Sequence, residues 1–264
     1  EPQAMREAVA MHNELLRRLI KQHRGYESVF LHQHNTGAAG GEGYFCVVFA
    51  QPLDALRWCD EVQRELLTLE WPPALLGVLY AREEVAGVAD GVLFRGPRVR
   101  MGVHHGPISR TRDPVSNRFE YFGAAVKVAT ELTLRAEGGH VLVSDAVVSA
   151  VEALSEPVTN GNGGDDDVAL DKDRALYGRQ RFQQVGAVEV MVANGGSMLE
   201  VEVHDMRLSG LEDRCQAWEQ AGSSSNHTSA RSGTTTHTGG SSSTSSGGGS
   251  SRPRLLARPD EAAY

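Results

Sequence analysis

Residues 119–131, FEYFGAAVKVATE, combine charged side chains with a backbone suited to holding a ligand. An aromatic segment reaches Gly123 and runs directly into a pattern typical of the first turns of a helix. Glycine lets a backbone approach a ligand closely, and a helix N-terminus offers free N–H groups. Glu120, Lys127 and Glu131 are therefore candidate site residues, and the question is whether they still take part in chemistry.

Two histidine pairs and a glycine-rich run suggest metal or phosphate binding less strongly. His32 and His34 lie in a polar segment with no third ligand close in sequence, which disfavours a metal site. His104 and His105 follow a strand pattern, where such pairs are more often core or interface residues than a metal site or general base. The run GAAGGEG at 37–43 joins two predicted strands and lacks the Lys-Ser/Thr and the following helix of a phosphate-binding loop.

The spacing of apolar residues predicts the elements that position these side chains. The helices are predicted at 2–23, 53–69, 122–137 and 145–154, and the strands at 25–31, 44–50, 98–106, 140–144, 182–192 and 199–206. A loop or short strand excursion is predicted at 74–97, and a hairpin at 108–121. Gly138 and Gly139 are predicted to end one helix, and Asp145 to cap the next.

This order predicts an α/β (α+β) sandwich with a mostly antiparallel sheet and helices on one face. A ferredoxin-like βαββαβ core fits best, with its first strand missing from the chain, which starts inside a helix. The folded domain is predicted at 1–220. Residues 221–264 are predicted to form a disordered linker or tail, because 222–252 is almost purely Ser, Thr and Gly.

Composition narrows the partners and the compartment. The net charge of -8 is spread along the chain without a basic block, which argues against nucleic acid and anionic membranes as partners. No apolar run approaches the roughly 18 residues of a membrane span. Cys46, Cys59 and Cys215 are widely spaced in apolar surroundings, which favours buried thiols in a reducing compartment. We therefore expect a cytoplasmic domain, or the cytosolic part of a larger or membrane-anchored protein.

Four segments together resemble the catalytic domain of class III nucleotidyl cyclases, most closely those of fungal and protist adenylate cyclases. They are PQAMREAVAMHNELLRRLIKQHRGYE (2–27), WCDEVQRELLTLEWP (58–72), RGPRVRMGVHHGPISRTRDPVSNRFEYFGAAVKVA (95–129) and AEGGHVLVSDAVV (136–148). The resemblance extends over about residues 1–214. It implies a domain that pairs head to tail with a second one and converts ATP or GTP to a cyclic nucleotide. In the family, two carboxylates of one domain hold Mg²⁺ or Mn²⁺, and the partner reads the base and stabilises the transition state.

The resemblance also assigns roles to positions of this chain. The first metal carboxylate belongs to a strand before residue 1, and the second corresponds to Gly43, with Glu42 one residue away. Glu120 corresponds to the base-reading Asp. The base-reading Lys has no counterpart, because no lysine occurs between Lys21 and Lys127. Lys127 and Glu131 stand where the family has its transition-state Asn and Arg, and Met191 stands where it has a phosphate-binding Lys.

These substitutions predict a degenerate domain. Glu131 places a negative charge where triphosphate charge must be neutralised, and Lys127 and Glu131, four residues apart, are expected to pair with each other. We expect a regulatory or structural partner, in a homodimer or heterodimer with another cyclase-type domain, that no longer retains Mg²⁺ or Mn²⁺. Two alternatives stay open: an active cyclase that uses shifted groups such as Glu42, Glu120 and an upstream Asp, and a sensor that binds ATP or GTP without turnover.

Overall fold

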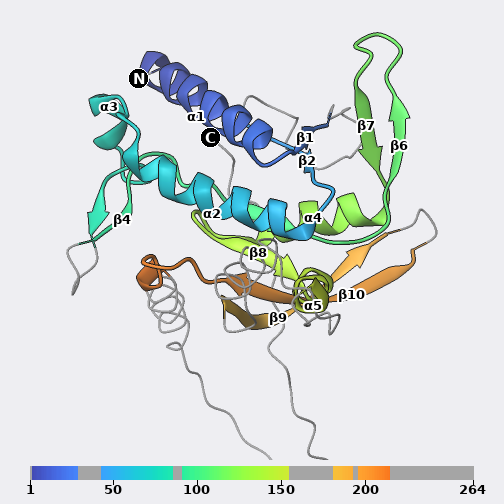
Figure 1. The fold of residues 1–264 in the computed structure, drawn as a ribbon. Coiled ribbons are helices and arrows are strands. Elements are labelled where there is room, and N and C mark those ends of the chain that lie inside the picture. The colour runs from blue at the N-terminus through green and yellow to red at the C-terminus, as the bar shows by residue number, and fades with distance from the viewer. Residues whose placement is uncertain (1, 29–42, 86–90, 155–180, 193–195, 215–264) are drawn as a thin grey trace, which may run out of the picture.

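The computed structural model describes residues 2–28, 43–85, 91–154, 181–192 and 196–214 (Figure 1). Its helices are α1 (Pro2–Gln22), α2 (Pro52–Thr68), α3 (Pro73–Leu76), α4 (Ala124–Arg135) and α5 (Asp145–Leu154). Its strands are β1 (Tyr26–Glu27), β2 (Val47–Val48), β3 (Glu84–Val85), β4 (Val92–Phe94), β5 (Met101–Val103), β6 (Ser109–Arg112), β7 (Phe119–Phe122), β8 (Val141–Ser144), β9 (Phe182–Met191) and β10 (Met198–Met206). Glu42, His32, His34, Cys215 and the predicted tail at 221–264 lie outside the described residues.

The central sheet has the strand order β5-β8-β10-β9. β5 and β8 run parallel, whereas β8, β10 and β9 pair antiparallel, so the mixed α/β architecture and the mostly antiparallel sheet are confirmed. Three separate two-stranded pairs surround this sheet: β1 with β2, β3 with β4, and β6 with β7. The first pair is shorter among the described residues than the sequence predicted, because only 26–27 and 47–48 form a ladder.

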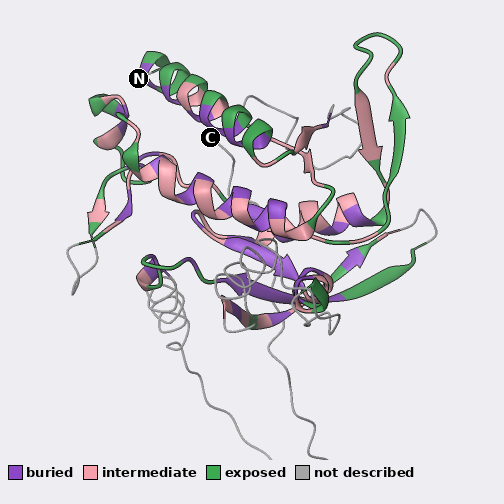
Figure 2. Ribbon diagram, viewed as in Figure 1, coloured by how far each residue is buried: buried purple, intermediate pink, exposed green. Residues whose placement is uncertain are grey.

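Helices cover both faces of the sheet, so the prediction of helices on one face was wrong. Val141 and Val143 of β8 belong to a core with α1, α2 and α5, whereas Leu142 belongs to a second core with Val128 and Leu132 of α4. Successive strand residues point to opposite faces, so the two cores lie on opposite sides of β8. Figure 2 shows the buried residues concentrated on these strands and on the inward sides of the helices.

The position of α4 depends on a glycine in β5. A Cβ atom at Gly102 would lie 2.4 Å from the carbonyl oxygen of Ala129 and 2.4 Å from the backbone nitrogen of Thr133. Only glycine lets strand and helix backbones come this close. α4 starts directly after Gly123, whose φ of 122° is in the region that favours glycine, and it ends at Arg135, before the Gly138-Gly139 pair expected to stop it.

The hairpin β6–β7 projects away from the sheet (Figure 1). Aromatic contacts fix its base, because the ring of Tyr26 packs edge-on against both Phe119 and Tyr121. The backbone N–H of Phe119 donates to the Tyr26 hydroxyl at 2.7 Å, and that of Tyr121 donates to the Ser28 hydroxyl at 3.1 Å. The predicted hairpin at 108–121 is thus confirmed, and it contacts β1 through Tyr26.

Candidate functional site

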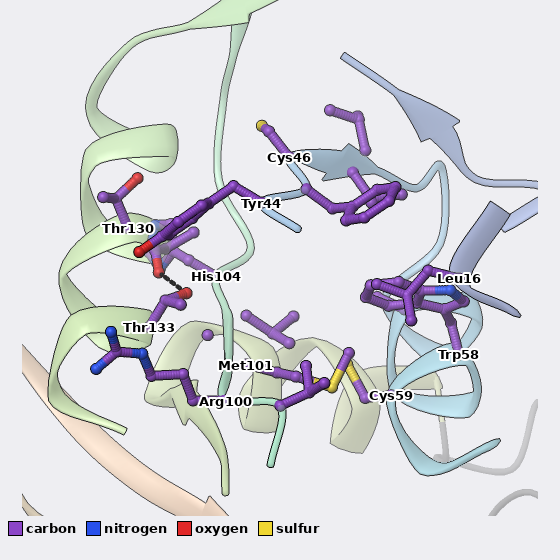
Figure 3. A pocket seen from close by; sticks show the side chains of 18 of the residues that line it. Leu16, Tyr44, Cys46, Trp58, Cys59, Arg100, Met101, His104, Thr130 and Thr133 are labelled. Atoms are coloured by element: carbon purple, nitrogen blue, oxygen red, sulfur yellow. Dashed lines mark hydrogen bonds between the residues drawn. The ribbon is translucent and has the colours of Figure 1, made fainter. Parts of the chain in front are cut away.

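A cavity of about 500 Å³ lies along β5, the outer strand of the described sheet (Figure 3). Arg100, Met101 and Gly102 all line it, although consecutive side chains of a strand point to opposite faces. The cavity therefore lies at the strand's edge. Residues 43–52, with β2, form the wall opposite this edge, and α1, α2 and α4 supply the rest of the lining.

The α1–α2 side of the cavity is apolar. Leu16, Trp58 and Cys59 are buried and project toward it (Figure 3). Burial raises the pKa of the Cys46 thiol to about 11 and also raises that of Cys59. Both thiols are free, and their raised pKa favours the protonated form, which is a poor nucleophile.

The side of the cavity that faces α4 carries several polar groups. Nδ1 of His104 lies 2.8 Å from the Ser144 hydroxyl, and burial, followed by the nearby His105, lowers the pKa of His104. The hydroxyls of Thr130 and Thr133 donate at 2.9 Å to the carbonyls one turn back on α4 (Figure 3). His104, Thr130 and Thr133 offer groups that can form hydrogen bonds with a ligand, and the guanidinium of Arg100, which also lines the cavity, adds a positive charge (Figure 3).

Gly43 lines this cavity, which places the predicted second metal position at its wall. No heavy atom lies within 4 Å of a Cβ built on Gly43, but its φ of 104° disfavours any other residue. None of the described residues that line the cavity is an aspartate or a glutamate. Mg²⁺ and Mn²⁺ prefer carboxylate oxygens, so this described lining does not fit the family's metal pair.

Lys127 and Glu131 lie outside the lining of the cavity and do not pair with each other, so the predicted ion pair was wrong. Nζ of Lys127 donates to the carbonyl of Val192 at 3.3 Å. Glu131 instead pairs with Arg135, the next residue on the same helical row. The two side chains have different partners because Lys127 lies beside the end of β9, whereas Glu131 lies one turn before Arg135.

Glu120 lies in β7 opposite Thr111, away from the cavity lining and from α4's charged row. Its side chain points to the face opposite Phe119 and Tyr121, since neighbours in a strand alternate. Met191, the predicted phosphate-binding position, is 59% exposed at the end of β9. Within one chain, Gly43 therefore lines the cavity, whereas Glu120, Lys127 and Glu131 lie outside its lining.

Sequence reasoning missed one group of potential ligands. Asp145, Glu202 and His204 each offer a ligand atom within 4.8 Å of the others. Asp145 was expected only to cap a helix; α5 begins at Asp145 itself. No sequence motif joins residues this far apart. The pairing of β8 with β10, which brings them together, was not predicted from the sequence. No described helix is long and apolar enough to cross a membrane.

Comparisons with known proteins agree with the fold. Residues 1–162 match the model of the adenylate and guanylate cyclase catalytic domain. Adenylate cyclase of Neurospora crassa is 30% identical over 217 residues, which are 80% of this chain and 8% of that protein. A putative serine/threonine-protein kinase/receptor of Acanthamoeba polyphaga mimivirus is 37% identical over 150 residues, 57% of this chain and 9% of that protein.

A solved adenylate cyclase of Trypanosoma brucei in its monomeric state has the same fold, with a TM-score of 0.53 and 23% identity over 78% of this chain and 80% of that chain. The chain spans about a tenth of the length of the curated relatives named above. The match to the family model covers more than half of the sequence. This chain therefore belongs to the family of adenylate and guanylate cyclase catalytic domains.

Proposed function

We propose that this domain is a catalytically degenerate nucleotidyl cyclase domain that serves as a regulatory or structural partner of another cyclase-type domain in the cytoplasm. The observation that carries the proposal is the ion pair between Glu131 and Arg135 on α4. Glu131 stands at the family's transition-state Arg position and is paired with Arg135. The guanidinium of Arg135, one turn further along α4, is thereby held by Glu131 and is not free to neutralise a developing phosphate charge.

The cavity at Gly43 supports the same conclusion from the other half of the site. Cyclisation requires deprotonation of a ribose hydroxyl and neutralisation of the triphosphate, which the family achieves with carboxylate-bound metal ions. The described lining supplies no carboxylate. In a head-to-tail dimer this chain would therefore weaken both composite sites, the one completed by its Gly43 side and the one completed by its α4.

The first test is product formation by the purified chain, alone and mixed with a catalytically competent cyclase domain. We expect no cAMP or cGMP from the chain alone with Mg²⁺ or Mn²⁺, and a change in the partner's activity on mixing. Metal-dependent product from the chain alone, above a heat-killed control, would establish the alternative of an active enzyme with shifted ligands. Sedimentation at tens of micromolar that shows only monomers, with and without the cyclase, would contradict the partner role.

Nucleotide binding without turnover is a second candidate, and one contact favours it. The ammonium of Lys127 donates to the carbonyl of Val192, directly beside Met191. A positive charge therefore lies next to the position where the family holds its phosphate-binding Lys. Titration with a fluorescent ATP analogue tests this role, since Lys127→Met should weaken binding if the ammonium contacts phosphate and leave it unchanged if it does not.

A further inference from the structure

Three potential metal ligands meet where β8 passes into α5. Ser144, the last residue of β8, pairs with Val203 of β10. Glu202 and His204 flank Val203, and alternation turns their side chains to the face opposite that of Val203. Asp145 follows Ser144 as the first residue of α5, which packs against β10 (Figure 1). The strand pairing thus brings Asp145 to the two β10 side chains.

His204 is the buried member of this group. It is only 5% exposed, and its Nε2 atom has no hydrogen-bond partner among the described residues. The nearest ion-pair oxygen, Oδ1 of Asp145, is 3.4 Å from Nε2 but does not form a hydrogen bond with it. A buried nitrogen without a hydrogen-bond partner destabilises the folded state, because it loses its hydrogen bonds to water without replacing them. Nε2 of His204 and Oδ1 of Asp145 are 3.4 Å apart, so an ion beside both atoms can bind the two of them at once.

The 3.4 Å distance between Nε2 of His204 and Oδ1 of Asp145 is the distance expected between two ligand atoms of one transition-metal ion. Two ligands that are each about 2.1 Å from a tetrahedral ion lie about 3.4 Å from each other. The third ligand atom, from Glu202, lies within 4.8 Å of the other two. Glu202 is partly exposed. One imidazole and two carboxylates form a set that Zn²⁺ binds, whereas Mg²⁺ and Ca²⁺ prefer six or more oxygen ligands.

We propose that Asp145, Glu202 and His204 bind a divalent transition-metal ion of the zinc class, with water in the fourth position. The site is separate from the cavity, whose lining contains none of the three residues. Two of the ligands come from the middle of the sheet and the third from the start of a helix, so the ion joins α5 to β10. Its effect is therefore on the stability of this junction, and it does not depend on any cyclase activity.

The test is calorimetric titration of ZnCl₂ into the chelator-treated chain, with Mg²⁺ alone as a parallel titration. We expect one ion per chain to bind with micromolar or tighter affinity, to raise the melting temperature, and to be insensitive to millimolar Mg²⁺. His204→Gln should remove this ion or weaken its binding by more than about tenfold, and Asp145→Asn should weaken it in the same direction.

His140→Gln is the matched control, because His140 is also near a β10 carboxylate, with its Nδ1 3.9 Å from Asp205, but belongs to no described three-ligand group. It should leave zinc binding unchanged. The chain has 10 histidines, so the stoichiometry lost in the variant identifies the site. If His204→Gln does not fold, Asp145→Asn at the partly exposed helix start decides the question. Equal zinc affinity and stoichiometry in the wild type and in the folded variants would overturn the proposal.

Discussion

At the scale of single residues, Gly43 combines open space with a restricted backbone. Its φ of 104° lies in the left-handed half of conformational space, while a Cβ at this position would meet nothing within 4 Å. Contacts alone would therefore predict that a side chain is tolerated. The backbone predicts otherwise, because an L-residue held in this region loses about 1–2 kcal/mol. Gly43, the position of the family's metal-binding Asp, thus has space for a carboxylate side chain, but its backbone conformation disfavours any residue other than glycine.

Gly43→Ala is accordingly expected to lower the free energy of unfolding by about 1–2 kcal/mol. Gly77→Ala is the control, since Gly77 has a helical φ of -74° and its Cβ would meet only Ala74 oxygen at 3.7 Å. That change should be neutral or slightly stabilising. Urea unfolding of the three proteins measures the difference. Equal stability of Gly43→Ala and the wild type would show that residues 43–44 can relax without cost.

Restoring the family's groups on α4 is the corresponding test of nucleotide affinity. Lys127→Asn with Glu131→Arg removes the acid beside Arg135 and leaves two guanidiniums one turn apart. We expect a fluorescent ATP analogue to bind about tenfold more tightly with metal present, because the local charge changes by one unit in the positive direction. The same helix should lose roughly 0.5–1 kcal/mol, since a favourable pair at this spacing becomes a repulsive one.

The control for this pair of substitutions is Glu7→Arg, which reverses a charge on the exposed side of α1. It should leave the affinity for the analogue unchanged. Unchanged affinity in the α4 variant, with a normal melting curve, would mean that Lys127 and Glu131 do not belong to a nucleotide cleft. A gain shared by Glu7→Arg would instead reflect only the overall charge.

The sequence predicted residue positions better than residue partners. Gly43 at a cavity wall and Lys127 and Glu131 on one helix followed from motif spacing. The partners did not, because Lys127 binds a carbonyl 65 positions away and Glu131 had two possible cations on its own helix. Choosing between them requires the position of β9 relative to α4, which spacing along a single helix does not contain.

At the scale of elements, the packing of α4 on β5 rests on the absence of one Cβ. Gly102→Ala would place that atom 2.4 Å from two backbone atoms of α4, which cannot move aside as a side chain can. We expect a loss of about 3 kcal/mol or more, the upper range for overpacking a core. Thermal melts beside Gly77→Ala check this. A melting temperature within a few degrees of the wild type would show that α4 is free to shift outward.

Helix positions were predictable from periodicity, but the two-sided sheet was not recognised. α1 and α2 end within one residue of their predicted limits, because their apolar rows are long and regular. β8 contained a signal that pointed to the correct layering. Its four residues, VLVS, are all buried, and a continuous apolar run indicates a strand covered on both faces. The alternation of apolar and polar residues in 98–106, which includes the edge strand β5, instead suggested a sheet covered on one face.

At the scale of the whole molecule, buried histidines in separate parts of the fold share one electrostatic behaviour. Burial lowers the pKa of His12 in α1 and of His104 after β5. For His140, just before β8, burial and then the charge of Arg214 lower the pKa to about 4. Asp205 would favour the charged form, but Nδ1 of His140 is 3.9 Å from its carboxylate, too far for a hydrogen bond. Burial therefore favours the neutral form of these three histidines.

The sign of the resulting pH dependence follows from linkage. An unfolded histidine titrates near pH 6.5, whereas folded His140 titrates near pH 4, so its contribution is complete above about pH 6.5 and is lost as the pH falls toward 4. This single group accounts for about 3 kcal/mol over that interval. Urea unfolding at several pH values between 7.5 and 4.5 should therefore show a steeper decline for the wild type than for His140→Gln, whose side chain does not titrate. Parallel declines in the two proteins would show that folded His140 is protonated without loss of stability, and that other groups determine the acid stability of the chain.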